Sequence, residues 1–323
     1  MKPLHFFFPA LIATLLALLL PAISFGDDGS HALNENDSLT SRRRLTTVRG
    51  TGLANAVVAN ATGTSAVWHN PAAIADAMMY AIDATYRYQH NDNTHGFQVN
   101  ILDMKSNNYV GVQIGYMYEH SNLNGASQHY NHVRLGLGIP LATDIVSIGV
   151  TGAYEHIKCT GGNSSSSGAA PDAIENNRTG LSMGTMDVGL MIRPTKYLSI
   201  GFATTNLFVG DYKDLMPRMI ATGIAFNSLE LGLNVMFEAS FNLSAAKIKN
   251  TGAFSVGLEY VLQNMFPLRL GYRYEMLGEI HVLSAGLAFR DSGGRFGLDL
   301  AYQHIFEPVN NNDIFQAGFS AYF

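Results

Sequence analysis

The chain ends with the stretch FQAGFSAYF, residues 315–323, in which apolar side chains alternate with small or polar ones up to the last residue. Phe315 and Phe323 fall on one face, and Gln316 and Ser320 fall on the other. A period of two is typical of a β-strand whose two faces meet different surroundings. Chain ends are usually poorly ordered unless something holds them. The stretch therefore predicts a final strand that pairs with another strand and presents its apolar face to an apolar environment.

The same alternation recurs through most of the chain. Segments of about ten residues, such as LELGLNVMFEA at 229–239 and FPLRLGYRYE at 266–275, repeat it between turn residues, and a tilted strand needs about 9–11 residues to cross a bilayer. Fourteen such segments begin near residues 79, 95, 108, 131, 145, 181, 196, 217, 228, 251, 266, 280, 295 and 313.

The links between these segments sort by length. Every second link is long, as at 121–128, 159–179 and 208–215, whereas the others are tight turns such as RPTK and RDSGG. This arrangement is typical of bacterial outer-membrane barrels. The alternative, a soluble β-sandwich, has no reason to sort its hairpins in this way. The sequence predicts an all-β fold, a 14-stranded antiparallel transmembrane β-barrel over 79–323, in the outer membrane with both termini periplasmic.

The N-terminal residues predict export. Lys2 precedes an apolar run over 4–20, and Ser24-Phe25-Gly26 is a small-x-small cleavage site, so residues 1–26 read as a signal peptide rather than as a membrane anchor. Residues 27–48 form a polar segment. Cys159 is the only cysteine, which excludes an internal disulfide and a thiolate metal cluster.

The face expected to line the lumen combines charge with glycine. Glycine in a strand often marks the close approach of another backbone, so we expect residues 49–78 to be packed inside as a plug. The charged positions are Asp83, Arg87, Glu119, Arg134, Glu155, Asp187, Arg193, Glu230, Glu238, Glu259, Arg269, Arg273, Glu275 and Asp299. The glycines are Gly111, Gly115, Gly136, Gly138, Gly149, Gly189, Gly201, Gly232, Gly257, Gly271, Gly286, Gly297 and Gly318.

A motif ahead of the first strand suggests a family. The stretch 49–77 carries a small-residue pattern and then an aromatic residue followed by Asn-Pro-Ala; its matching positions are Gly50, Gly52, Ala54, Trp68, Asn70, Pro71 and Ala72. This stretch resembles the N-terminal part of the FadL-type outer-membrane transport proteins and their PorV/PorQ-like relatives. The resemblance implies fourteen strands and a plug, or hatch, whose Asn-Pro-Ala turn lies against a kink in the third strand, where the wall opens sideways. Gly111 and Gly115 would suit that gap.

Motifs for catalysis and nucleic-acid binding are missing from the sequence. It contains no HExxH, no GxSxG elbow supports a serine nucleophile, and the GTGLAN stretch lacks the preceding strand of a dinucleotide site. The net charge of −5 gives no footprint for nucleic acid. We expect neither an enzyme nor a cofactor or metal site.

Two functions remain open. The first is passive uptake or export of hydrophobic small molecules, fatty-acid-like or aromatic, through a plugged barrel with a lateral exit. Its pocket would use the loop residues Leu207, Phe208, Val209, Leu215 and Met216. The alternative is a PorV-like partner or scaffold for protein secretion or surface attachment. The expected partners are the lipid bilayer, a hydrophobic molecule or a secretion-system protein, and the barrel assembly machinery, whose recognition signal the terminal Phe323 resembles.

Overall fold

The computed structural model describes residues 46–91, 93–107, 109–123, 126–142, 145–160, 181–208, 216–228, 230–245, 248, 251–306 and 312–323. The predicted signal peptide, most of the polar segment 27–48, Val209 and Leu215 lie outside the described residues.

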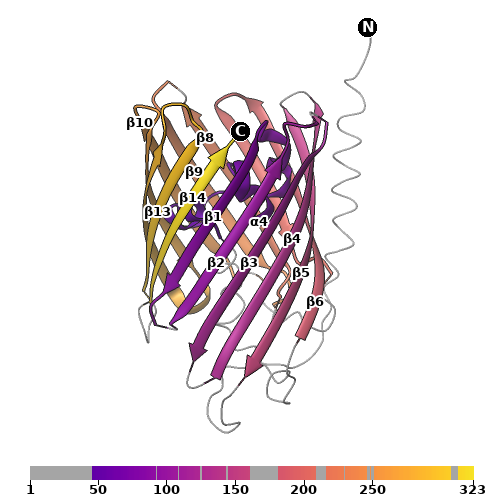
Figure 1. Cartoon of the computed structure of the whole chain (residues 1–323), viewed down its shortest axis with the longest axis vertical. Coiled ribbons are helices and arrows are strands. Elements are labelled where there is room, and N and C mark those ends of the chain that lie inside the picture. Colours follow the sequence, from indigo (N-terminus) through magenta and orange to yellow (C-terminus); the bar gives the residue numbers. More distant parts are fainter. Residues whose placement is uncertain are drawn as a thin grey trace. The chain divides into compact units, whose positions relative to one another are not determined.

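Within this part of the chain, fourteen antiparallel strands close into a barrel in which β1 pairs with β14 (Figure 1). The predicted fold class is confirmed. The strands are β1 (Tyr80–Gln89), β2 (Thr94–Asp103), β3 (Gly111–Leu123), β4 (Ala126–Ala142), β5 (Val146–Thr160), β6 (Leu181–Thr195), β7 (Leu198–Thr205), β8 (Met219–Ser228), β9 (Leu233–Asn242), β10 (Ala253–Leu262), β11 (Phe266–Glu275), β12 (Ile280–Arg290), β13 (Phe296–Phe306) and β14 (Asn312–Tyr322). The single turn η7 (Leu277–Glu279) joins β11 to β12.

The two faces of the wall differ as the alternation predicts. Large apolar side chains point outward, and Leu270, Leu298 and Leu300 are each more than half exposed. The residues between them point into the barrel and are buried. Such a wall suits a bilayer, because lipid covers the apolar face and closure leaves no strand edge unpaired.

The closing strand β14 is paired with the first strand up to the last residue. The Phe323 backbone N–H donates to the Tyr80 carbonyl at 2.8 Å, and the Tyr80 N–H donates back to the Phe323 carbonyl at 3.4 Å. Their rings lie 5.8 Å apart. The last residue is therefore held by the first strand. We call this end of the barrel, where Tyr80 and Phe323 meet, the terminal end, and the opposite end the distal end.

Two boundaries differ from the prediction. The stretch 121–128 is not a loop, because β3 and β4 continue pairing through Ser121↔Gln128 to Leu123↔Ala126. Backbone pairing can continue in polar residues beyond the bilayer, where the apolar alternation stops. The other boundary is β9, which begins at Leu233 rather than near 228. Glu230 and Gly232, expected in the lumen, lie in the preceding turn, where Gly232 has a φ of +64°.

Short helical elements precede β1: α3 (Val48–Gly52), η3 (Gly63–Ser65), α4 (Ala66–His69) and η4 (Pro71–Asp76). They lie inside the barrel, where Figure 1 shows them in indigo behind the front strands. The Thr47 side chain caps α3 by accepting the Gly50 N–H at 3.2 Å, and Asn70 caps η4 by accepting the Ala72 N–H at 3.1 Å. Among the described residues, no helix has the length and apolar character needed to cross a membrane.

Candidate functional site

Residues 46–79, which we call the luminal segment, fill the middle of the barrel. Trp68 is 4% exposed, and Asn70, Ala72 and Ile74 are fully buried. The segment contacts strands on opposite sides of the wall, because η4 packs on β4, β5 and β6 whereas α3 packs on β12 and β13. These residues are small and partly helical, which lets their backbone lie close to the wall.

One side of the wall receives the segment on glycines. We call Gly136, Gly138, Gly149 and Gly189 on β4, β5 and β6 the glycine seat. A methyl group added at Gly149 would overlap the Pro71 carbonyl, and one at Gly189 would overlap the Asn70 side chain. At Gly138 it would lie 2.6 Å from the Ala75 nitrogen. Only glycine permits this approach of two backbones.

The Asn-Pro-Ala turn therefore rests on β5 and β6, not on the third strand as expected. The Asn70 side-chain amide donates to the Val58 carbonyl at 2.8 Å and to the Leu190 carbonyl of β6 at 3.3 Å. Asn70 thus ties two parts of the luminal segment to the wall as well as capping η4.

The sideways gap expected at Gly111 and Gly115 is not present in the described part of β3. This strand pairs with β2 from Val112 to His120 and with β4 from Gly111 to Leu123 without a register shift. A methyl at Gly115 would lie 2.8 Å from the Trp68 ring, and one at Gly111 would lie 2.9 Å from Ile74. The two glycines make room for the luminal segment instead of opening the wall.

A second group of glycines holds the first turn of the segment. Gly257 and Gly271 lie under Leu53 and Ala54, where a methyl at Gly271 would lie 2.5 Å from the Ala54 nitrogen. Ala54 has a φ of +52°, a conformation that residues with a Cβ rarely adopt. Gly52 packs against Gly286 of β12, and a methyl at Gly50 would lie 2.8 Å from the His69 ring.

Polar wall residues bind the backbone and the single Trp of the segment. The Trp68 Nε1–H donates to Asn100 Oδ1 at 2.6 Å, and the Arg134 guanidinium lies 5.2 Å from the centre of the Trp68 ring. Arg134 also donates to Asp187 at 2.5 Å and to the Val67 carbonyl at 3.2 Å. These groups are buried, so each polar contact replaces water that the segment excludes.

Glu238 of β9 is a contact that the sequence did not reveal. One oxygen of its carboxylate accepts the Val57 N–H at 3.0 Å and the Val58 N–H at 2.9 Å. Glu238 was correctly predicted to face the lumen, but nothing in its neighbourhood in the sequence indicates its partners, which lie far away in the chain.

On the other side of the lumen, an ion-pair chain reaches the segment. Arg49 donates to both Glu259 oxygens at 3.0 and 2.9 Å. Arg269 joins Glu259 to Asp299, with both distances 2.7 Å, and Arg290 binds Asp299 at 2.8 Å. Three guanidinium groups thus alternate with two carboxylates.

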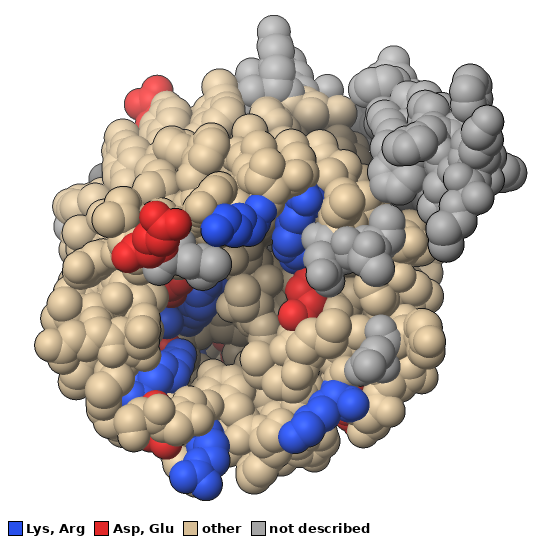
Figure 2. All heavy atoms as spheres, turned by 90° about the horizontal axis from the view of Figure 1, so that it is seen from above, with Lys and Arg blue, Asp and Glu red and all other residues tan. Residues whose placement is uncertain are grey.

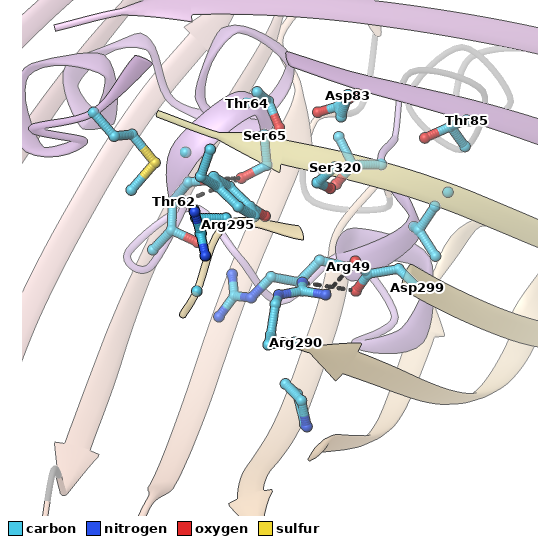
Figure 3. Close-up of a pocket in the computed structure, with 18 of the residues that line it drawn as sticks. Arg49, Thr62, Thr64, Ser65, Asp83, Thr85, Arg290, Arg295, Asp299 and Ser320 are labelled. Carbon is cyan, nitrogen blue, oxygen red and sulfur yellow. Dashed lines mark hydrogen bonds and ion pairs between the residues drawn. The ribbon is translucent and has the colours of Figure 1, made fainter. Parts of the chain in front are cut away.

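This chain borders a cavity of about 620 Å³ that we call the vestibule. Figure 2, a view onto the terminal end, shows the hollow with basic and acidic side chains around its mouth. Figure 3 shows Arg49, Arg290 and Asp299 meeting on one side of the cavity. At its rim, Asp291 accepts the backbone N–H groups of Phe296, Gly293 and Arg295 in the β12–β13 turn. These hydrogen bonds, that from Phe296 foremost, lower the pKa of Asp291.

The predicted loop pocket is divided between the two faces of the wall. Met216 is 1% exposed and packs inside with Ile157 and Met183, while Leu207 is partly buried. Phe208 is 64% exposed and borders an outer groove with Val133 and Tyr154. The described residues of this loop therefore do not form one pocket.

Within the described ranges, no three His, Cys, Asp or Glu side chains are placed so that they could hold a metal ion.

Comparison with known proteins shows the fold. No family model matches the chain, and no curated protein matches it. A FadL homologue from Pseudomonas aeruginosa is similar in structure, with a TM-score of 0.63, 12% identity, and coverage of 85% of this chain and 98% of that one. The CymD monoaromatic hydrocarbon channel has a TM-score of 0.64 at 12% identity, covering 86% and 97%. A deltaS2 mutant of the TodX monoaromatic hydrocarbon channel has a TM-score of 0.55 at 12% identity, covering 85% and 99%. The chain shares the FadL-type barrel fold.

Proposed function

We propose that this barrel spans the bacterial outer membrane with its terminal end in the periplasm and passes hydrophobic small molecules, fatty-acid-like or aromatic, down their gradient. In this proposal the luminal segment is the plug. A solute crosses when the segment shifts, since the wall at β3 is continuous. The fold is that of proteins described as monoaromatic hydrocarbon channels, which supports the solute class without identifying the solute.

The observation that carries the proposal is a pair of buried apolar clusters at the distal end of the barrel. Ile157, Met183 and Met216 form one cluster there. A second cluster comes from β12, β13 and β14 and consists of Ile280, Val282, Ile305 and Ile314. These side chains are only 1–7% exposed because they pack against one another. A water-filled passage through this end would expose them at a cost in free energy, whereas a hydrophobic solute would keep them in apolar contact.

A second candidate, a scaffold for a secreted or surface protein, is favoured by one observation. The described residues of the luminal segment are packed against most strands of the wall, and several are fully buried. A barrel that never moves a solute has no need to open. Its partner would bind outside the lumen.

Uptake into intact cells separates the two candidates. Cells that produce the full chain should accumulate a labelled fatty acid or toluene faster than cells without it, and Met183→Asp should remove most of the gain by placing a charge in the distal cluster. The control is Ser182→Asp on the neighbouring, outward-facing position of β6, which should retain uptake. Equal uptake with and without the protein would favour the scaffold.

A further inference from the structure

The vestibule has the composition of a binding site for an anionic amphiphile. Its polar wall carries four guanidinium groups, from Arg49, Arg269, Arg290 and Arg295, against three carboxylates, from Asp83, Glu259 and Asp299. Most of these charges are already engaged with one another. A ligand can therefore bind only those guanidinium groups that face the cavity and still have unused N–H donors.

Two of the four arginines face the cavity with donors to spare. Arg269 is 2% exposed and bonds both carboxylates, so it is fully used. Arg290 ends the ion-pair chain and is 22% exposed. The Arg295 guanidinium is exposed at the rim and donates no hydrogen bond to any residue that the structure describes. Arg290 and Arg295 are therefore the cationic groups that an incoming anion would reach first, and planar guanidinium groups bind carboxylate and phosphate well.

The Asp291 turn sets the position of Arg295. Its carboxylate accepts three backbone N–H groups, so residues 291–296 are held in one conformation although they are exposed. Asp291 itself does not line the cavity, although its carboxylate lies near enough to Arg295 for the two charges to interact. A fixed turn reduces the loss of conformational freedom when a ligand is bound.

Apolar side chains flank the arginines around the vestibule. Val261 pairs with Pro267 beside the pair of Glu259 with Arg269, and the Tyr322 N–H donates to the Arg295 carbonyl at 2.8 Å. Met79 and Phe323 also line the cavity, as do the hydroxyl groups of Thr47, Thr62, Thr64, Ser65, Thr85 and Ser320. A cavity lined by cationic groups, hydroxyl groups and apolar side chains suits a molecule that has an anionic headgroup on an apolar chain.

We infer that the vestibule binds the anionic headgroup, a carboxylate or a phosphate, of an amphiphile. Arg290 and Arg295 bind the headgroup, and the apolar tail of the amphiphile packs against the apolar side chains that line the cavity. The headgroup could belong to a membrane lipid at the barrel rim or to a free amphiphile in the lumen. The site does not depend on transport, because the cavity lies on the terminal side of the packed luminal segment and is open in its present conformation.

The test is calorimetric titration of the full-length barrel in phosphatidylcholine nanodiscs. Hexanoate should bind more tightly than either hexanol, which lacks the charge, or inorganic phosphate, which lacks the chain. Arg295→Gln and Arg290→Gln should each weaken hexanoate binding roughly tenfold, as expected for the loss of one charge-assisted hydrogen bond. Arg295→Gln leaves the ion-pair chain from Arg49 to Arg290 intact. The matched control is Lys105→Gln, an exposed cation at the same end but outside the cavity.

Each outcome decides the inference. If phosphatidylglycerol added to the discs competes with hexanoate, the site takes lipid headgroups; if it does not, the site takes free amphiphiles. Either result supports an anionic-amphiphile site. Hexanoate that fails to bind, or binds equally to the Arg295→Gln variant, would overturn it. If inorganic phosphate bound as tightly as hexanoate, the apolar side chains would not contribute to binding, which would overturn the amphiphile as the ligand.

Discussion

The two sides of the lumen hold the luminal segment through different sets of contacts. On β4, β5 and β6, the glycine seat brings backbone onto backbone, and no flexible side chain lies between the wall and the Asn70–Pro71 turn. On β10 to β13, the segment also lies on Gly257, Gly271 and Gly286, but here Arg49 is in addition held by charged side chains beside an open cavity. A close-packed contact has one arrangement, whereas an ion pair can exchange partners with water or a ligand. The comparison suggests that the glycine contacts are fixed on both sides, whereas the Arg49 contact beside the cavity can be released.

Filling the glycine seat should have the largest effect. Gly149→Val places a side chain where the Pro71 carbonyl lies, and neither backbone can yield. Overpacking ordinarily lowers the free energy of unfolding by about 1–3 kcal/mol. We expect a loss of at least the upper value for Gly149→Val. The matched control is Gly152→Val on the same strand, where no atom lies within 4 Å of the added group. Thermal unfolding in detergent measures both variants. Equal midpoints would show that the turn does not rest on the seat.

Breaking the ion-pair contact should cost less than filling the seat. Arg49→Leu removes one partner of Glu259 but leaves its ion pair with Arg269. We therefore expect the free energy of unfolding to fall by about 3 kcal/mol, the lower end of the range for a broken buried ion pair. The exposed pair of Arg193 with Asp76 offers the control, since Arg193→Leu should cost only about 0–1 kcal/mol. If both substitutions have the same effect, the burial of the Arg49 pair contributes nothing.

Weakening the Glu238 contact should have a smaller effect again. Glu238→Gln keeps an oxygen that accepts the Val57 and Val58 N–H groups but removes the negative charge of the carboxylate. We expect the free energy of unfolding to fall by about 1–2 kcal/mol. Trp68, the only Trp of the chain, reports on the luminal segment by its fluorescence. An unchanged unfolding midpoint measured by Trp68 fluorescence would show that the charge of Glu238 adds nothing to these two hydrogen bonds.

The smallest effect concerns the rim of the vestibule. Because the folded-state pKa of Asp291 is lowered, its contribution is present above the unfolded pKa of about 3.9 and is lost as the pH falls through the folded value. Asp291→Asn should therefore lower the unfolding midpoint slightly at pH 7 and match the wild type in strong acid. A difference that grows in acid would contradict this assignment.

The sequence predicted the strands of the barrel wall better than the contacts of the luminal segment inside it. Alternation is a local property, so most strands start within a few residues of the prediction. It failed at 121–128, where pairing outlasts the apolar pattern, and before Leu233, where a turn follows the same alternation.

The luminal contacts were predicted in kind but not in place. The inward glycines indicated that another backbone lies close, and it does. However, the turn at Asn70 rests on β5 and β6, while Gly111 and Gly115 seat Ile74 and Trp68. Which glycine meets which residue depends on the three-dimensional path of the segment, and no periodicity encodes that path.

The central claim is that the luminal segment closes this barrel. Single-channel conductance in planar bilayers, compared between the full chain and a variant lacking residues 49–77, tests it most directly. The altered migration of unheated samples on gels shows whether the deleted variant still forms a closed barrel. We predict a folded barrel with a stable open conductance well above that of the full chain. A folded deletion variant that conducts no more than the full chain would contradict the claim.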